Sequence, residues 1–362
     1  MSGGADLPDC GGPNNNNDTP LGAPRGPRDG EPGARLMLRR LFGAVTGSAI
    51  AGLAFLSSLS SPAMAGLGQP TSGELGLQLP ATSLMSELSS LHNTVNVIII
   101  AIAVFVLLLL LYVIFRFNEK SNPAPSRTTH NTALEVAWTI VPILILVAIA
   151  IPSFKLLYEQ NRFPKPDITI KAVGNAWFWD HEYLDQGITL STNMLHDEDV
   201  LKAKTGDKEF NDKFGNLEGV ARREAVYAAA ADVWKERNEP RQLSVDQEIA
   251  IPLGKVVHLL ITSNDVIHSW TIPSFGVKQQ AVPGRTAAVW FQADKEGIFY
   301  GQCSVLCGKN HSGMPIAVRV VKPEVYDNWM AALKAKDKAK AAEILKAAAE
   351  SLRSNQALAQ AQ

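Results

Sequence analysis

Residues 301–315 read GQCSVLCGKNHSGMP, and this stretch has the most specific residue pattern in the chain. Cys303 and Cys307 stand four residues apart, His311 follows four later, and Met314 comes three after that. Two thiolates, an imidazole and a thioether form a soft ligand set, which favours copper over magnesium, calcium or manganese. The spacing therefore predicts a copper site in the last third of the chain.

This ligand set lacks a second imidazole, and His268 is the best candidate to supply it. It lies in the upstream stretch NDVIHSWTIPS, and the residues between it and Cys303 read as strands and turns that can fold back. Two alternatives for the cysteines stay open at this point. A disulfide would close a very short loop and leave His311 and Met314 without a role, whereas a structural zinc site seldom uses methionine.

Taken together, CSVLCGKNHSGM and the upstream His-Ser-Trp resemble the dinuclear copper A centre of cytochrome c oxidase subunit II of the bacterial type. The resemblance implies two copper ions bridged by both thiolates, one histidine on each copper and methionine as a weak ligand. Sharing one electron between two metals keeps the rearrangement on oxidation and reduction small. The implied ligands are His268, Cys303, Val305 through its backbone carbonyl, Cys307, His311 and Met314.

The amino-terminal part of the 362-residue chain reads as export signals. Residues 1–34, which contain Cys10, are rich in glycine, proline and asparagine, so we expect a disordered leader. Residues 35–65 have a basic start, an apolar centre and a final Ala-Met-Ala, as in a cleaved signal peptide. The alternative, a first membrane helix, is disfavoured by its glycines and serines. Residues 66–90 would then form an external segment.

Two apolar stretches predict a transmembrane helical hairpin within residues 91–155. Residues 95–115 carry no charge, and as a helix they would reach roughly 32 Å, enough for a ~30 Å hydrocarbon core. Residues 133–153 form the second span, in which a proline is tolerated if neighbouring helices satisfy the freed carbonyl. Against one acidic residue, the connecting loop carries Arg116, Lys120 and Arg127. The positive-inside rule therefore places the loop in the cytoplasm and both flanking segments outside.

Glu135 stands at the start of the second span. A carboxylate there is favourable near the positive end of a helix dipole, but ionisable residues within spans are also candidates for function. The stretch EVAWTIVP (135–142) is similar to a segment of the subunit II family in which the glutamate lies at the mouth of a proton channel into subunit I. The resemblance implies that role for Glu135.

Short β-like runs separated by Pro and Gly turns begin after residue 160 and indicate a sandwich or barrel. With the copper motif, they predict an all-β, cupredoxin-like Greek-key barrel over residues 160–323. Residues 195–238 are charged and alanine-rich and read as a helical insertion, after which the strands are expected to resume at residues 241–246. Residues 324–362 read as a helical, partly disordered tail.

Trp177 is the aromatic residue with an implied role in electron transfer. It resembles the surface tryptophan through which cytochrome c passes its electron in the family, whereas Trp179 is expected in the core. Three acidic residues nearby could steer a lysine-rich partner, although a charged run is most often a solvated face. These candidate docking residues are Asp180, Glu182 and Asp185.

Three positions depart from the family pattern. Val305 replaces a glutamate whose carboxylate normally binds magnesium beside subunit I, so we expect a weakened or absent magnesium site. Ala176 replaces a glutamine, and Gly313 replaces an aromatic residue, which is expected to loosen Met314 and shift the redox potential. Electron transfer should survive all three.

The sequence thus predicts the copper-bearing subunit of an aerobic terminal oxidase in the bacterial inner membrane, with its amino terminus and copper domain in the periplasm. The resemblance implies cytochrome c as donor, subunits I and III as partners, and oxygen reduction with proton pumping in the complex but not by this chain alone. The net charge of −1 gives no indication of a nucleic-acid partner. A membrane-tethered copper carrier or assembly protein is the alternative. A quinol oxidase subunit would lack the copper residues, and a nitrous oxide reductase would need a much larger second domain.

Overall fold

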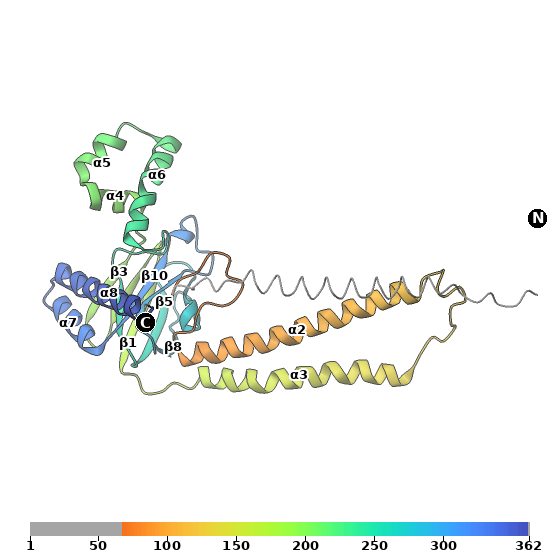
Figure 1. Ribbon diagram of the computed structural model, residues 1–362. Coiled ribbons are helices and arrows are strands. Elements are labelled where there is room, and N and C mark those ends of the chain that lie inside the picture. The colour runs from red at the N-terminus through yellow and green to blue at the C-terminus, as the bar shows by residue number, and fades with distance from the viewer. Residues whose placement is uncertain (1–66, 361–362) are drawn as a thin grey trace, which may run out of the picture. The chain divides into compact units, whose positions relative to one another are not determined.

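A computed structural model describes residues 67–360, with the side chains of 355–360 excepted. These residues belong to one compact unit, 62–362. The expected leader (1–34), the expected signal peptide (35–65) and Cys10 lie outside the described residues. Figure 1 shows a pair of long helices, a β domain and two smaller groups of helices.

Helices α2 (Ser83–Arg116) and α3 (Thr132–Gln160) lie side by side (Figure 1). Both begin at a side-chain cap: the Thr82 hydroxyl accepts from the N–H of Met85, and Asn131 caps α3 in the same way. In the described chain these two helices are long and apolar enough to cross a membrane, and no residue of their most apolar windows is buried. An apolar surface left uncovered over such a length suits lipid.

The helices are longer than the spans expected from the sequence. Helix α2 has 34 residues and is about 51 Å long, so about 20 Å of it extends beyond a ~30 Å hydrocarbon core. Its first turn is anchored to the β domain, because Thr82 donates to the carbonyl of Phe275 (2.9 Å) and Met85 is buried. The extra turns therefore connect the span to the β domain.

Among the described residues, the strands form three sheets. The first is mixed, with the order β3-β2-β1-β5-β8, in which β1 runs parallel to β5; the second has the order β4-β10-β9, and the third pairs β6 with β7. Their bounds are β1 Ile168–Asn175, β2 Phe178–Tyr183, β3 Ile188–Thr192, β4 Ile249–Pro252, β5 Val256–Ser263, β6 His268–Ile272, β7 Val277–Ala281, β8 Ala287–Gln292, β9 Gly297–Gln302 and β10 Pro315–Val321.

An aromatic core holds these sheets together. Strand β5 alternates strictly between half-buried and buried residues, as expected for a strand with one face on the core. The ring of Phe275 stacks on Phe291 at 5.0 Å and packs against Phe299 at 4.9 Å, and Trp270 stacks on Phe291 at 6.2 Å. Aromatic pairs of this kind add about 0.5–1.5 kcal/mol beyond their burial. A rigid core beneath the ligand loops follows from this packing.

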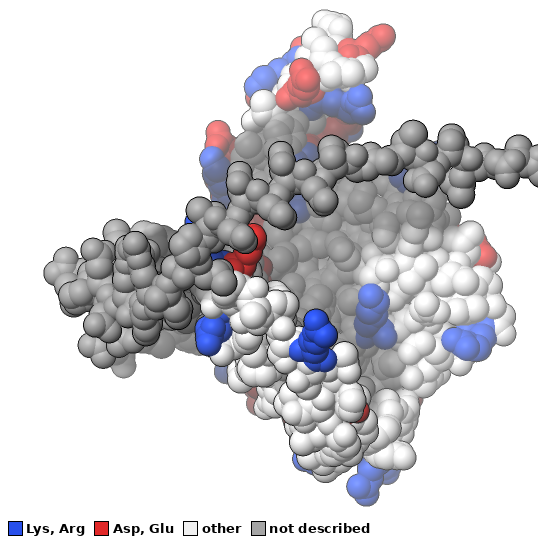
Figure 2. Space-filling model, turned by 90° about the vertical axis from the view of Figure 1, so that its right-hand side faces the viewer, with Lys and Arg blue, Asp and Glu red and all other residues white. Residues whose placement is uncertain are grey.

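The helical insertion has a small core of its own. Helices α4 (Asp197–Thr205), α5 (Asp207–Phe214) and α6 (Gly219–Arg237) bury Phe210 and Trp234 between them. At the top of Figure 2, where these helices lie, Lys and Arg side chains are interspersed with Asp and Glu. This face of the insertion therefore has no dominant charge.

The prediction of a strand at residues 241–246 is wrong. Helix α6 ends at Arg237, its C-cap Asn238 is in the left-handed conformation, Pro240 follows, and residues 241–243 form a turn. The N–H groups of Leu243 and Ser244 bond to the carbonyl of Pro240, which closes the turn and leaves only one isolated bridge, at Val245, before β4. Proline and the turn bonds override the alternation of the sequence here.

Two helices follow β10. Helix α7 (Pro323–Lys334) starts with proline in its first turn and buries Trp329 and Met330 against the β domain, while α8 (Lys338–Gln360) packs on α7. The tail thus contributes to the main core, which its alanine- and lysine-rich composition did not reveal. Trp329 packs edge-on against Tyr183 at 5.7 Å.

Candidate metal centre

Three ligand atoms converge at one edge of the β domain. The side chains of His268, Cys303 and Cys307 are all buried, and their ligand atoms lie within 4.8 Å of one another. His268 is the first residue of β6, whereas Cys303 directly follows the last residue of β9. The ends of two separate strands therefore position the site. The N–H of Cys303 donates to the carbonyl of Met314 (3.0 Å), which closes the loop that carries the cysteines.

Each thiol has its own imidazole. Cys303 Sγ lies 3.9 Å from His268 Nδ1, and Cys307 Sγ lies 3.4 Å from His311 Nδ1. The two sulfur atoms are 3.8 Å apart and both cysteines are free, so the disulfide alternative does not hold in the described chain. Cys303 Sγ also lies 3.3 Å from the carbonyl oxygen of Val305.

The electrostatics of the two thiols would favour a bound cation. Burial alone would raise the pKa of Cys303, but its hydrogen bonds, first that with His268, lower this pKa to about 6. Burial and the negative charge of Cys303 raise the pKa of Cys307 to about 12. Two adjacent thiolates therefore repel each other unless positive charge compensates them, and metal ions supply that charge. The chemistry of the donor set fits copper.

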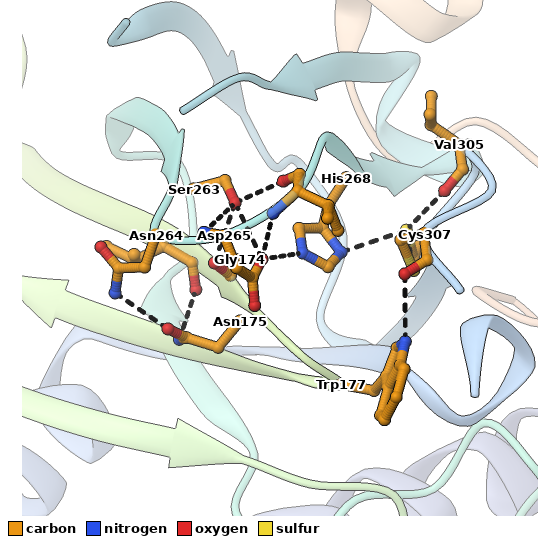
Figure 3. Close-up of polar contacts among 12 residues, drawn as sticks. Gly174, Asn175, Trp177, Ser263, Asn264, Asp265, His268, Val305 and Cys307 are labelled. Atoms are coloured by element: carbon orange, nitrogen blue, oxygen red, sulfur yellow. Dashed lines mark hydrogen bonds and ion pairs between the residues drawn. The ribbon is translucent and has the colours of Figure 1, made fainter. Parts of the chain in front are cut away.

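Asp265 orients the first histidine. Its Oδ1 accepts from His268 Nε2 at 2.7 Å, which places the ring proton on Nε2 and turns the lone pair of Nδ1 toward Cys303 (Figure 3). Burial alone would lower the pKa of His268, but its contacts with Cys303 and Asp265 outweigh this and raise it. Asp265 is not among the residues predicted from the sequence, although a carboxylate three residues before a candidate ligand histidine, in NDVIH, indicates such a role.

Gly174 makes room for the same ring. A Cβ atom on Gly174 would lie 2.7 Å from His268 Cδ2, closer than carbon atoms approach. Trp179, which is the cross-strand partner of Gly174 and is fully buried as expected, packs edge-on against the His268 ring at 5.9 Å. The imidazole is thus held by a hydrogen bond, a backbone surface and an aromatic ring.

Trp177 contacts the site directly. Its Nε1 donates to the carbonyl oxygen of Cys307 at 3.2 Å (Figure 3), and the indole is half-buried. Gly308 has a φ of +123°, and a Cβ there would lie 3.1 Å from the ring. The chain after Cys307 therefore folds closely round the indole.

Comparison with known proteins assigns the family. The family model described as cytochrome c oxidase subunit II, transmembrane domain, matches residues 70–156, and that described as cytochrome c oxidase subunit II, periplasmic domain, matches residues 213–321. Cytochrome c oxidase subunit 2 of Cereibacter sphaeroides is 41% identical over 290 residues, which cover 80% of this chain and 90% of that protein. The chain belongs to the cytochrome c oxidase subunit II family.

Other members of the subunit II family show comparable similarity. A probable cytochrome c oxidase subunit 2 of Rickettsia conorii is 40% identical over 73% of both chains. The crystal structure of the periplasmic domain of subunit II of cytochrome oxidase of Bradyrhizobium japonicum is 36% identical, covers 48% of this chain and 99% of that one, and has a TM-score of 0.36. Membership confirms the expected fold class, an apolar helical hairpin followed by a cupredoxin-like β domain, and makes this a membrane protein.

The resemblance also gave roles to Glu135 and to three candidate docking carboxylates, and their surroundings differ. Glu135 is half-buried in the first turn of α3. Asp180 accepts from Ser191 Oγ at 2.5 Å and from Asn175, while Glu182 pairs with Lys171 at 3.2 Å. Asp185 is exposed and accepts from a backbone N–H at 2.9 Å. These three acidic residues thus already have partners within the chain.

Proposed function

We propose that this chain is the electron-accepting subunit II of an aerobic terminal oxidase, anchored in the bacterial inner membrane with its β domain in the periplasm. The observation that carries this proposal is the pairing of each free thiol with its own imidazole, beside an indole bonded to Cys307. Cytochrome c would be the donor, and subunits I and III the membrane partners.

The metal-holding groups we propose are those implied by the sequence. Two copper ions held there would supply a one-electron redox centre. Met314 is 1% exposed and lies in the same buried cluster as the cysteines, so its thioether is shielded from water. The set comprises His268, Cys303, the Val305 carbonyl, Cys307, His311 and Met314.

The burial of the two cysteines favours this proposal over a copper carrier. A carrier must release its metal and needs exposed ligands, whereas Cys303 is 2% and Cys307 is 7% exposed. The backbone bonds that close the loop and the packing around His268 hold the ligands in one geometry. Fixed ligands favour a resident metal with little rearrangement.

We assign Trp177 the uptake of electrons from cytochrome c. Its N–H bond to the carbonyl of a ligand residue gives the indole a direct path to the centre. Asp180, Glu182 and Asp185 stay a predicted docking group, weakened by their partners within the chain. The centre would then pass the electron to heme in subunit I, where oxygen reduction and proton pumping would take place. We propose that Glu135 lies at the mouth of a proton channel into that subunit.

The test uses the intact oxidase with Trp177→Leu. We expect turnover with cytochrome c to collapse, while copper content and the electron paramagnetic resonance (EPR) spectrum stay at wild-type values, because the indole is no ligand. A small reductant that bypasses the docking surface should reduce the variant at the normal rate. Unchanged turnover with cytochrome c would contradict the proposal.

Asp265→Asn should weaken copper binding about 10- to 100-fold, since the amide can no longer fix the His268 tautomer as a carboxylate does. Competition with a copper chelator on the full chain in detergent measures this affinity. Asn264→Ala, at the neighbouring loop position bonded to Asn175 (2.8 Å), is the matched control and should bind copper normally. Equal loss in both variants would show a general disturbance of the loop instead.

Magnesium should be absent or weakly held at the interface with subunit I, because Val305 offers a carbonyl but no carboxylate. Metal analysis of the purified complex tests this, with Val305→Glu as the gain-of-site variant. Stoichiometric magnesium in the wild-type complex would refute the expectation.

A further inference from the structure

A lysine covers the indole assigned to electron uptake. Lys309 Nζ lies 5.5 Å from the centroid of the Trp177 ring, within the range of a cation–π contact. Lys309 is exposed, and among the described residues no carboxylate lies within ion-pair distance of it. Its position follows from the Cys307–Gly308 backbone, which contacts the ring.

None of the three candidate docking carboxylates forms an ion pair with Lys309. Glu182 forms its ion pair with Lys171, and Asp180 keeps its charge but hydrogen-bonds to Ser191 and Asn175 and forms no ion pair with Lys309. Asp185 lies beyond the far end of the six-residue strand β2, which alone spans about 16 Å. The charge that directly faces the indole is therefore positive.

We propose that Lys309 selects the electron donor, favouring a redox protein that brings an acidic side chain to the face of Trp177 next to its exposed cofactor. This inference rests on the proposed role of Trp177. A donor with only lysines round its cofactor meets a like charge at the point of closest approach. Such a charge at a rim alters the association rate more than the affinity.

The experiment compares two c-type cytochromes with the intact oxidase, one with lysines and one with acidic residues round the heme edge. Second-order rate constants are measured for wild type, Lys309→Met and Lys309→Glu across ionic strength. Charge reversal should lower the rate with the acidic donor about tenfold at low salt and raise it with the basic donor. Lys309→Met should fall between, and the differences should vanish near 1 M salt, where the Debye length is ~3 Å.

Lys165→Glu is the matched control. Lys165 is exposed and precedes β1, whose other end leads to Trp177, so the same charge change occurs far from the indole. It should leave the ratio of the two rates unchanged. Copper content of every variant is measured in parallel, since Lys309 stands two residues from Cys307 and from His311.

The rates of the Trp177 and Lys309 variants distinguish a failure of donor selection by Lys309 from a failure of electron uptake through Trp177. If Trp177→Leu slows both donors but Lys309→Glu shifts neither rate, or shifts both in the same direction, donor selection by Lys309 is wrong. If Trp177→Leu slows neither donor, the proposed electron uptake itself fails.

Discussion

Replacing either Cys303 or Cys307 with serine is expected to remove copper from the full chain. The two sulfur atoms lie 3.8 Å apart and each contacts one imidazole, so in the proposed centre the loss of either thiolate would remove a ligand that no neighbouring group replaces. The loss should far exceed the ~10- to 100-fold weakening expected for a supporting residue such as Asp265. Metal analysis and EPR measure it, and turnover with cytochrome c should fall in parallel.

Leu306→Ser is the matched control, because it introduces a serine in the same loop at a side chain that is 79% exposed and is not one of the proposed ligands. We expect wild-type copper content and a spectrum in which one electron is shared by two coppers. A wild-type spectrum of one isolated copper ion would overturn the dinuclear proposal, as would copper retention in both motif variants.

Acidification should destabilise the β domain through His181. Burial lowers the pKa of this fully buried imidazole from 6.5 to about 3. Its Nε2 accepts from Trp270 Nε1 at 3.2 Å, so its ring proton is on Nδ1, facing Thr192 Oγ1 at 3.3 Å. Protonation of Nε2 would set two N–H groups against each other.

The direction of the stability change with pH follows from the linkage between proton binding and folding. Between pH 6.5 and 3 the unfolded chain binds a proton at His181 that the folded chain does not, so stability falls as the pH falls through this window. At pH 4.5 the loss should be about 2–3 kcal/mol relative to pH 7. Thermal unfolding of the full chain in detergent, followed by tryptophan fluorescence, measures it.

His181→Gln keeps an acceptor for Trp270 and a donor for Thr192 but has no proton to gain. Subtracting its pH profile from that of wild type removes the titration of carboxylates such as Asp167 and Asp197, whose pKa values are lowered in the fold. Identical profiles would show that His181 does not govern acid stability.

Local patterns explain why much of the molecule could be predicted. Four ligand candidates lie within twelve residues, and the two apolar stretches are long enough to span a bilayer irrespective of their neighbours. Proline and glycine turns bound the β-like runs after residue 160, and strands β2 and β5 alternate in burial as strands with one face on the core do. Where turn chemistry competed with alternation, at residues 241–246, the prediction failed.

Sequence alone determined the ligand types, the membrane hairpin and the β class of the outer domain, because spacing and periodicity act over a few neighbouring residues. Three features became visible in the folded chain alone: Asp265 and Gly174 hold His268, Lys309 lies over Trp177, and the tail joins the core. These contacts join residues from separate strands and loops, or depend on how one loop closes. Their distances are fixed by the packing of the sheets, which no local pattern encodes.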